Sequence, residues 1–380
     1  MHDRSALGPA DVSDDELTRM VAALWDAEPS EVELLSSAIV SVDYGLPALT
    51  TEARHRVRGR ARRAGVDTDY SLFVKHLRCW SRSPAFAEVP PEIRDFAATG
   101  VPWRTEALVY RSDLAERLPN GLRMPRAVGV FDLDELSAAV WLADIAAVDV
   151  DWDIGRYQRA AYLLGRLAGS PEVAPYAGVG EFPWSVRTYA EGRLAHQVIP
   201  LLNMDGIWAH PLVAGAFDGE LKARLLAAAG QVDDLVTELE QYPVTTAHGD
   251  ACPNNLLVHD PADDGFTLID FGFWMPLPVG FDLGQLLVGD VQIGRRNTSD
   301  LVKRDEACLE AYVDGLCADG DGIGVDAVRR AHALHLLLFT GLSTVPFEYL
   351  ETRSTPLLRA MIDDRAAIAR YSLDLLDATG

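Results

Sequence analysis

The segment that decides the fold is TAHGDACPNNLLV at residues 246–258, and LIDFG follows it at residues 268–272. In the first stretch, Asn255 lies five residues after Asp250. A loop with this spacing can present a carboxylate to an attacking hydroxyl group and an amide oxygen to a metal ion. Two short apolar strands, separated by a turn, then lead to a second carboxylate at Asp270. The pattern predicts a phosphoryl-transfer centre built on a β-hairpin.

The composition predicts a folded chain with two or three lobes. Hydrophobic residues make up 48% of the 380 positions, which is enough to bury a substantial core. The longest apolar runs are far shorter than a membrane span, and the first residues lack the charged-then-apolar pattern of an export signal. We therefore expect a cytoplasmic protein that does not enter a membrane. The four cysteines show no metal-binding spacing, so we expect them to be reduced, with no structural zinc.

The chain is strongly acidic. It contains 34 Lys and Arg residues against 57 Asp and Glu residues, which gives a net charge of −23. This charge repels nucleic acids and anionic membranes, and it favours a cationic small molecule as a partner. The alternative, in which the charge serves only solubility, stays equally open. No feature of the sequence indicates an oligomeric state.

Five arginines at every second position depart from the acidic trend. Because side chains alternate along a strand, these residues would share one face of it. A nucleic-acid-binding stripe is one interpretation, but no aromatic residues are interleaved and the whole chain is acidic. The pattern favours a solvent-exposed strand face that charge protects. The five residues are Arg54, Arg56, Arg58, Arg60 and Arg62.

Hydrophobic periodicity predicts an α+β protein with three segments. Residues 1–37 are expected to form a helical N-terminal extension, residues 38–143 a nucleotide-binding lobe with a twisted antiparallel sheet, and residues 144–380 a helical lobe. The expected strands are two within residues 38–61, then 70–77, 126–131, 138–142, 256–258 and 266–269. The expected helices are 14–25, 102–118, 153–167, 184–197, 220–241, 284–288, 301–316, 325–342 and 357–376.

A lysine upstream of the two motifs can supply a counter-charge for nucleotide phosphates. Lys75 lies on the third expected strand, and Glu106 lies on the following helix, where it could hold the ammonium group. Kinase-like enzymes pair a strand lysine with a helix glutamate in this way. The alternative is a surface lysine whose stem lies along an apolar strand, and the loop downstream favours the phosphate role over it.

Together these motifs resemble the aminoglycoside phosphotransferase family, the small-molecule branch of the protein-kinase-like fold that also contains choline and homoserine kinases. HGDACPNN and IDFG are similar to the family patterns HGDxxxxN and IDxG, and the resemblance covers roughly residues 38–345. It implies a bilobal, protein-kinase-like fold with a small antiparallel-sheet N-lobe and a mainly helical C-lobe. It also implies ATP or GTP as the phosphoryl donor and Mg²⁺ as the metal.

The resemblance implies roles for single residues. Asp250 would be the catalytic aspartate, and Asn255 and Asp270 would bind magnesium. Lys75 would hold the α- and β-phosphates, with Glu106 as its partner. The hinge that pairs with the adenine edge would consist of Leu142, Ala143, Asp144 and Ile145. The phosphate-covering loop departs from the family pattern, because residues 41–51 contain a single glycine, Gly45.

Two polar residues near the loop have structural alternatives to a catalytic role. His248 precedes Asp250 by two positions. The loop already contains a base and a metal ligand, so we expect the histidine to pack beneath it. Asp282 matches an aspartate of the family that follows the hairpin. We expect its carboxylate to accept backbone N–H groups near the loop or to cap a helix.

The acceptor is expected to be a small molecule. Gly249 occupies the position where protein kinases carry an arginine that senses a phosphorylated activation loop, and residues 273–278 are too few to form such a loop. An antibiotic or amino-sugar-like compound fits the family and the acidic charge, which would indicate resistance or self-protection. The alternatives are a metabolic kinase for a sugar, amino alcohol or hydroxyacyl thioester, and a non-catalytic nucleotide-binding regulator. Candidate acceptor contacts are Trp184, Tyr189, Trp208, Trp274, Glu348, Tyr349, Glu351, Asp363 and Asp364.

Overall fold

The chain divides into two compact units. The computed structural model describes residues 2–43, 48–319 and 322–380. Unit 1 comprises Met1–Glu116 and Arg123–Val148, and unit 2 comprises Arg117–Leu122 and Asp149–Gly380. Among the described residues, no helix has both the length and the apolar character that a membrane crossing needs. The predicted α+β class is confirmed, since unit 1 is built on an antiparallel sheet and unit 2 is mainly helical.

A six-stranded sheet forms the centre of unit 1. Its strand order is β1-β2-β3-β4-β7-β6, and every neighbouring pair is antiparallel except β1 with β2. The strands β3 and β4 meet at a tight turn in which Ala64 and Gly65 both have positive φ, which suits the right-handed twist of a hairpin. The strands are β1 (His2–Asp3), β2 (Val32–Ser41), β3 (Thr51–Arg63), β4 (Val66–Arg78), β6 (Ala127–Asp134) and β7 (Ser137–Ala143).

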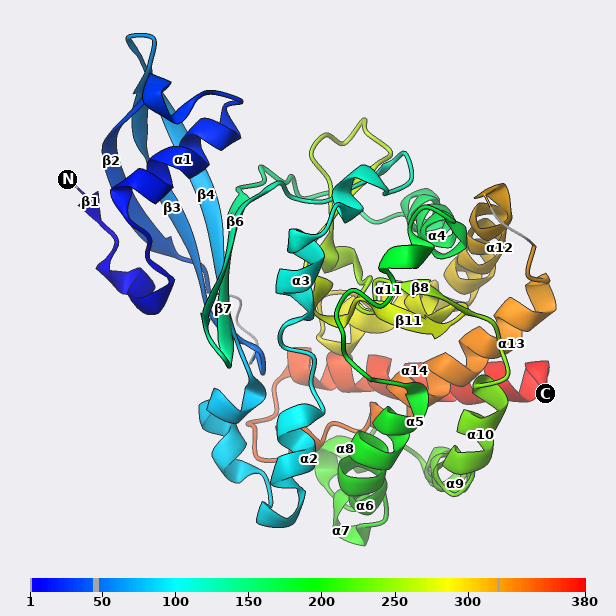
Figure 1. The fold of residues 1–380 in the computed structure, drawn as a ribbon. Helices are drawn as coiled ribbons and strands as arrows, with labels where there is room; N and C mark the ends of the chain where they lie inside the picture. Colours follow the sequence, from blue (N-terminus) through cyan, green and yellow to red (C-terminus); the bar gives the residue numbers. More distant parts are fainter. Residues whose placement is uncertain (1, 44–47, 320–321) are drawn as a thin grey trace. The chain divides into compact units, whose positions relative to one another are not determined.

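The N-terminal residues belong to unit 1 and do not form a separate extension. Helix α1 (Asp14–Leu24) begins where the Ser13 side chain accepts a hydrogen bond from the Glu16 amide. Its buried face, including Leu17, packs in one hydrophobic cluster with Trp141 of the sheet. Figure 1 shows α1 lying across the strands. The first long strand therefore begins earlier than the predicted residue 38, because the preceding six residues already pair with β3.

Two short helices follow β4 in unit 1, namely α2 (Arg94–Thr99) and α3 (Thr105–Arg111). A single helix was expected over residues 102–118, but α3 ends at Arg111 because Ser112 adopts an extended conformation. The Ser112 hydroxyl donates to the Val109 carbonyl at 2.7 Å, and this bond completes the last turn. The predicted phosphate-covering loop includes residues 44–47, which lie outside the described residues.

Helices dominate unit 2, and short strands carry the turns between them. The helices are α4 (Ile154–Gly169), α5 (Val186–Tyr189), α6 (Ile199–Leu202), α7 (Asp205–Trp208), α8 (Pro211–Ala214), α9 (Gly219–Ala229), α10 (Val232–Leu239), α11 (Phe281–Gln292), α12 (Leu301–Asp319), α13 (Val325–His335) and α14 (Pro356–Thr379). The remaining strands are β5 (Leu122–Arg123), β8 (Val244–Ala247), β9 (Leu256–Leu257), β10 (Phe266–Leu268) and β11 (Met275–Pro278).

The closest helix pair of unit 2 is α4 with α12, which lie side by side in Figure 1. Glycines allow the two backbones to touch. A Cβ atom on Gly165 would lie 2.0 Å from the Tyr312 carbonyl oxygen, and one on Gly315 would lie 2.0 Å from the Tyr162 carbonyl oxygen. Any side chain at these two positions would force the helices apart.

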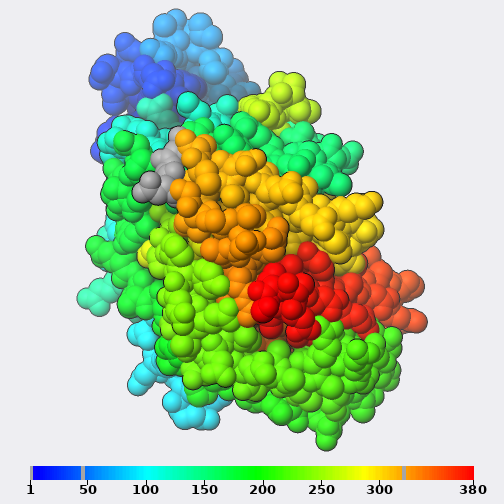
Figure 2. All heavy atoms as spheres, turned by 90° about the vertical axis from the view of Figure 1, so that its right-hand side faces the viewer, coloured from blue at the N-terminus to red at the C-terminus, as the bar shows by residue number. Residues whose placement is uncertain are grey.

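The helix predicted over residues 220–241 is two helices, because the chain breaks at Gly230, the C-cap of α9. The break lets α9 and α10 each reach a different partner. Arg224 of α9 forms ion pairs with α14, and Glu238 of α10 pairs with Arg330 of α13 at 2.6 Å. Figure 2 shows the end of α14 in red at the surface, between the orange α13 and the green segment that contains α9 and α10.

Candidate active site

The loop that carries the predicted catalytic residues begins with a turn that only glycine can make. Strand β8 pairs with β11 in antiparallel fashion, and Gly249 follows β8 with φ +81°. A Cβ atom on Gly249 would lie 2.0 Å from the Phe273 carbonyl oxygen. A side chain would therefore meet both a strained backbone and a steric clash.

Asp282, at the start of α11, fixes this turn from below. Its two carboxylate oxygens accept the backbone N–H groups of His248 and Gly249, each at 2.9 Å. The side chain is fully buried, and this burial raises the pKa of Asp282 to about 6 against the opposing effect of the two hydrogen bonds. The prediction that Asp282 satisfies backbone N–H groups near the loop is confirmed.

His248 joins the loop to the strand that precedes Asp270. Its Nε2 lies 3.0 Å from the Ile269 carbonyl oxygen, and the Asp250 backbone N–H donates to its Nδ1 at 3.3 Å. These partners fix the tautomer with the proton on Nε2. Burial lowers the pKa of His248 to about 4, so the imidazole is neutral at physiological pH. The histidine packs under the loop, as expected from the sequence.

Asp250 and Asn255 are in direct contact. The Asn255 side-chain amide donates to the Asp250 backbone carbonyl and to its Oδ2, both at 2.9 Å. Asn255 is buried, whereas Asp250 is partly exposed and so remains accessible to a small molecule. With both amide hydrogens directed at Asp250, the Oδ1 atom is the group that Asn255 can offer to a cation.

The β-hairpin predicted from the sequence brings Asp270 next to Asn255. Strands β9 and β10 are antiparallel, and the Ile269 amide donates to the Asn255 carbonyl at 3.1 Å. Asp270 then adopts a left-handed conformation with φ 63° and ψ 63°. A non-glycine residue with this backbone carries strain, and such strain is concentrated at functional sites.

The donor atoms in this part of unit 2 fit a hard divalent cation. Asp270 contributes a carboxylate and Asn255 an amide oxygen, and Mg²⁺ in proteins is bound by one or two carboxylates together with other oxygen ligands. The adjacent Asp250 carboxylate is held by the Asn255 amide. These residues could therefore hold a magnesium ion while Asp250 faces an acceptor.

In unit 1, Lys75 and Glu106 form the ion pair expected from the sequence. The Lys75 ammonium nitrogen lies 2.5 Å from the Glu106 carboxylate, and the two residues are 4% and 3% exposed. Lys75 comes from the centre of the sheet, between β3 and β7, and Glu106 comes from α3. A buried pair of this kind has a fixed geometry, which a phosphate-binding lysine requires.

The four predicted hinge residues do not offer equal access to a nucleotide base. Leu142 lies within β7 and pairs with both β4 and β6. The Ala143 amide donates to the Arg126 carbonyl at 2.8 Å, and the Asp144 amide donates to the Ser71 carbonyl at 3.3 Å. Two of the backbone donors are thus already bonded within unit 1, and Ile145 is the first residue beyond them.

The carboxylate of Asp144 is also engaged within unit 1. It lies 3.0 Å from the Arg56 guanidinium and accepts the Ser71 hydroxyl at 2.6 Å. Arg56 belongs to the arginine stripe of β3, and other members of that stripe pair with acidic neighbours, as Arg60 does with Asp67 at 3.0 Å. The stripe is a strand face with carboxylate partners, in agreement with the expected solvated face.

Several candidate acceptor contacts have structural partners. Trp274 is 1% exposed and donates to the Tyr176 carbonyl, which identifies it as a core residue. Trp208 is also buried and donates to the Leu202 carbonyl. Other candidates pack or pair as follows: Trp184 and Tyr189 against Phe339 with ring centroids 5.7 and 4.3 Å away, Glu348 with Arg365 at 2.8 Å, Tyr349 beneath the same arginine, and Asp364 with Thr298.

Sequence reasoning missed the side chains that line a pocket of about 690 Å³ in unit 2, among them Trp152, Arg296 and Arg304. They come from two segments far apart in the chain, the start of α4 and the link between α11 and α12. The consecutive arginines at positions 295 and 296 were the one local signal, and they gave no indication of the partner segment.

Known proteins resemble this chain in part or in fold. A model of the phosphotransferase enzyme family matches residues 114–329, which is more than half of the chain. No curated protein matches it significantly. Among solved structures, a spectinomycin phosphotransferase in complex with ADP and spectinomycin is 10% identical, with a TM-score of 0.46 and coverage of 97% of this chain and 98% of its own.

Two further solved structures have similar values. An aminoglycoside phosphotransferase from Streptomyces rimosus is 17% identical, with a TM-score of 0.41 and coverage of 90% of this chain and 99% of its own. An ethanolamine kinase from Plasmodium vivax is 12% identical, with a TM-score of 0.45 and coverage of 90% and 82%. The acceptors named for these proteins differ chemically from one another, so they do not identify the acceptor of this chain.

Proposed function

The chain belongs to the phosphotransferase enzyme family of small-molecule kinases, and on this basis we propose that it transfers the γ-phosphoryl group of ATP to a hydroxyl group of a small molecule. The observation that carries the proposal is the contact between Asp250 and Asn255. It joins a partly exposed carboxylate, suited to an acceptor hydroxyl, to an amide whose oxygen suits a cation. Asp270 follows on the paired strand.

The reaction requires positioning and charge neutralisation more than covalent chemistry, because phosphoryl transfer proceeds through a loose transition state. Asp250 would accept a hydrogen bond from the acceptor hydroxyl and take its proton as the phosphoryl group is transferred. Asn255 and Asp270 would hold Mg²⁺, which supplies positive charge to the phosphate oxygens when it is bound. The neutral His248 is not the base in this scheme, since its ring nitrogens already bond the loop.

The nucleotide contacts that we propose come from unit 1. Lys75 would hold the α- and β-phosphates, and Glu106 would hold the lysine. For the adenine edge, we propose the backbone of Ile145, because the Ala143 and Asp144 amides donate within the unit. A guanine nucleotide would make the same phosphate contacts, so the choice of ATP rests on the adenine edge.

For the acceptor, we propose an antibiotic or an amino-sugar-like compound, which the family and the net charge of −23 support. A metabolic small-molecule kinase would use the same Asp250, Asn255 and Asp270. A nucleotide-binding regulator would need no acceptor at all. These alternatives differ in turnover and in substrate, so kinetics can separate them.

The test is Mg²⁺-dependent ADP formation by the purified full-length protein, with a panel of aminoglycosides, other hydroxylated antibiotics, amino sugars, choline and simple sugars. We expect one class to stimulate turnover, and Asp250→Asn to lower kcat by a factor of about 10³ or more with little loss of stability. The exposed Asp363→Asn serves as the matched control for a carboxylate-to-amide change in the same unit. Undiminished turnover by Asp250→Asn would refute the mechanism, and ATP binding without any turnover would favour the regulator.

A further inference from the structure

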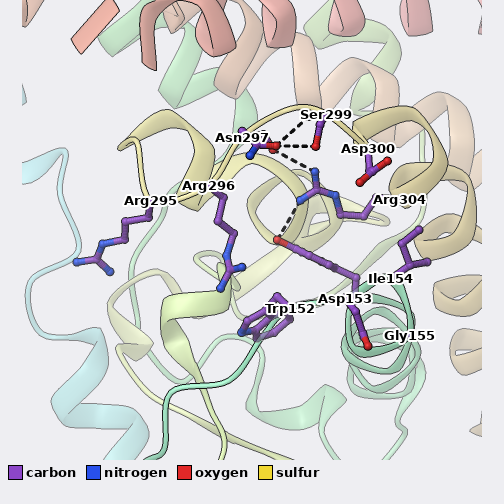
Figure 3. A pocket seen from close by; sticks show the side chains of 11 residues that line it. Trp152, Asp153, Ile154, Gly155, Arg295, Arg296, Asn297, Ser299, Asp300 and Arg304 are labelled. Carbon is purple, nitrogen blue, oxygen red and sulfur yellow. Dashed lines mark hydrogen bonds between the residues drawn. The ribbon is translucent and has the colours of Figure 1, made fainter. Parts of the chain in front are cut away.

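The pocket of unit 2 is lined by an unusual set of cationic side chains. It lies between the start of α4 and the chain that links α11 to α12, and its volume is about 690 Å³. Three arginines line it, Arg295, Arg296 and Arg304, although the chain as a whole has a net charge of −23. Figure 3 shows the Arg304 guanidinium facing Asn297, and Arg296 extending toward Trp152.

Arg304 is buried without a carboxylate partner. It is 6% exposed, and no acidic group of the described residues lies within ion-pair distance of it. Its guanidinium donates to the Tyr157 hydroxyl at 3.1 Å and to the Asn297 carbonyl at 3.2 Å, and it lies 4.7 Å from the Tyr157 ring centroid. The Nε atom is buried and has no hydrogen-bond partner within the described part of the chain.

A charge in this position costs free energy unless something compensates it. Neutral oxygen acceptors and a ring face offset only part of the desolvation of a guanidinium, and buried charges in proteins are normally paired. An arginine cannot lose its proton to relieve the cost. A ligand that carries negative charge would supply the missing compensation, and the unbonded Nε offers a donor for it.

The other charged groups at the pocket leave it suited to an anion. Arg296 is only partly compensated, since it pairs with Asp290 at 3.3 Å and also lies 5.8 Å from the Trp152 ring. Of the two carboxylates in the lining, Asp153 accepts the Arg156 amide as the N-cap of α4, and Asp300 is exposed. Neither pairs with an arginine of the pocket among the described residues.

From this arrangement we propose that the pocket binds a carboxylate or phosphate group of a small molecule, with Arg304 and Arg296 as its principal ligands. Guanidinium groups match both oxyanions because their N–H donors lie in one plane and can bond two oxygens together. The site is distinct from the phosphate contacts proposed for Lys75, which belongs to unit 1.

The pocket is connected to the proposed catalytic loop through one of its own residues. Arg295 donates to the side-chain oxygen of Asn254, which directly precedes Asn255. The bound oxyanion can therefore belong to an acceptor molecule or to a separate small anion. In the first case the preferred acceptor combines a hydroxyl group with a negative charge, which would replace the cationic acceptor expected from the net charge.

Calorimetric titration of inorganic phosphate into the full-length protein, in metal-free buffer at constant ionic strength, tests the binding site. We expect binding by the wild-type protein, and at least about tenfold weaker binding by Arg296→Gln and Arg304→Lys, because each loses charge-assisted hydrogen bonds. The half-exposed Arg296 variant keeps the test valid if the Arg304 variant does not fold. Arg359→Gln, at an exposed arginine of α14, is the matched control and should bind as tightly as the wild type.

Two results would overturn the proposal. One is the absence of phosphate binding, or equal binding by the wild type and Arg296→Gln. The other is binding that disappears in Lys75→Met but persists in Arg296→Gln, which would place the phosphate at the proposed nucleotide site. Because the titration requires no turnover, its outcome is independent of the proposed kinase activity.

A second arm identifies the source of the oxyanion. Hydroxy acids and sugar phosphates that bind with dependence on Arg296 are tested for Mg²⁺-dependent ADP formation. A compound that both binds and stimulates turnover carries the oxyanion as part of the acceptor. Compounds that bind without turnover indicate a separate anion, and either result supports the site.

Discussion

Gly249 shows how one residue without a side chain sets the shape of the proposed catalytic loop. Its φ is +81°, and a Cβ atom at this position would lie 2.0 Å from the Phe273 carbonyl oxygen, which leaves no room for alanine. We expect Gly249→Ala to lower the free energy of unfolding by about 2 kcal/mol or more and to lower kcat strongly, because the turn carries Asp250. Chemical denaturation and steady-state kinetics would measure both effects.

The control for this change is Gly178→Ala, at a turn glycine whose Cβ would meet nothing within 4 Å. It should leave stability and kcat close to those of the wild type, since alanine fits there and limits the unfolded chain slightly. If Gly249→Ala behaved like Gly178→Ala, the close approach of the loop to Phe273 would be wrong.

His248 predicts a pH dependence at the same scale. Its folded pKa of about 4 lies below the ordinary value of 6.5, so the unfolded chain binds a proton first as the pH falls. The stability from the neutral imidazole is complete above pH 6.5 and is lost as the pH falls toward 4. Relative to His248→Gln, we expect the wild type to lose about 3 kcal/mol of unfolding free energy between pH 7 and pH 4.

This comparison isolates the histidine, because Asp282 and His335 titrate in both proteins. The pKa of Asp282 is raised to about 6, which makes stability fall as the pH rises and therefore opposes the effect of His248 when the wild type is measured by itself. Urea denaturation at several pH values gives the difference directly. A difference that stays constant from pH 7 to pH 4 would mean that His248 titrates normally and is not buried beneath the loop.

At the scale of elements, β4 and α3 are joined by the ion pair of Lys75 and Glu106. Removing one member leaves the other charge buried, so we expect Lys75→Met to cost about 3–5 kcal/mol of stability. The double variant Lys75→Met with Glu106→Leu should recover much of that loss, because both charges are gone. Its turnover should stay low, since no residue replaces the lysine at the nucleotide phosphates.

A double-mutant cycle with both stability and kinetic measurements separates the two contributions of the pair. Recovery of stability without recovery of kcat would assign Lys75 a role beyond holding α3 to the sheet. Recovery of both would contradict the phosphate role and leave the pair as a purely structural contact.

Elements whose residues interact locally were predictable from the sequence, and elements set by distant contacts were not. The β9–β10 hairpin and α1 follow from turn, capping and periodicity signals within a few residues. The break between α9 and α10 depends on partners in α13 and α14, which no local window contains. The early start of β2 likewise depends on its pairing with β3.

The same distinction applies to the candidate site. Asp250, Asn255 and Asp270 lie within one short stretch, so spacing alone identified them. Arg304 meets Tyr157 across 147 positions, and its significance comes from burial and from missing partners. A sequence contains neither of those properties in readable form.

For the whole molecule, the dominant electrostatic fact is a net charge of −23. Repulsion among so many like charges opposes the compact state, whereas individual surface pairs such as Arg62 with Glu33 contribute only about 0–1 kcal/mol each. Salt screens both effects over a Debye length of about 10 Å at 0.1 M. Because the acidic excess outweighs the pairs, screening should stabilise the protein.

We therefore expect the Tm to rise by a few degrees between about 10 mM and 200 mM NaCl and then to level off, as the Debye length falls below the spacing of surface charges. Differential scanning fluorimetry at constant pH measures the effect, and replacing exposed carboxylates such as Asp233 and Glu351 by their amides should reduce it. A fall in Tm over this range would mean that surface ion pairs outweigh the repulsion. In that case the acidic charge would be balanced within the fold, and it would offer no long-range attraction to a cationic acceptor.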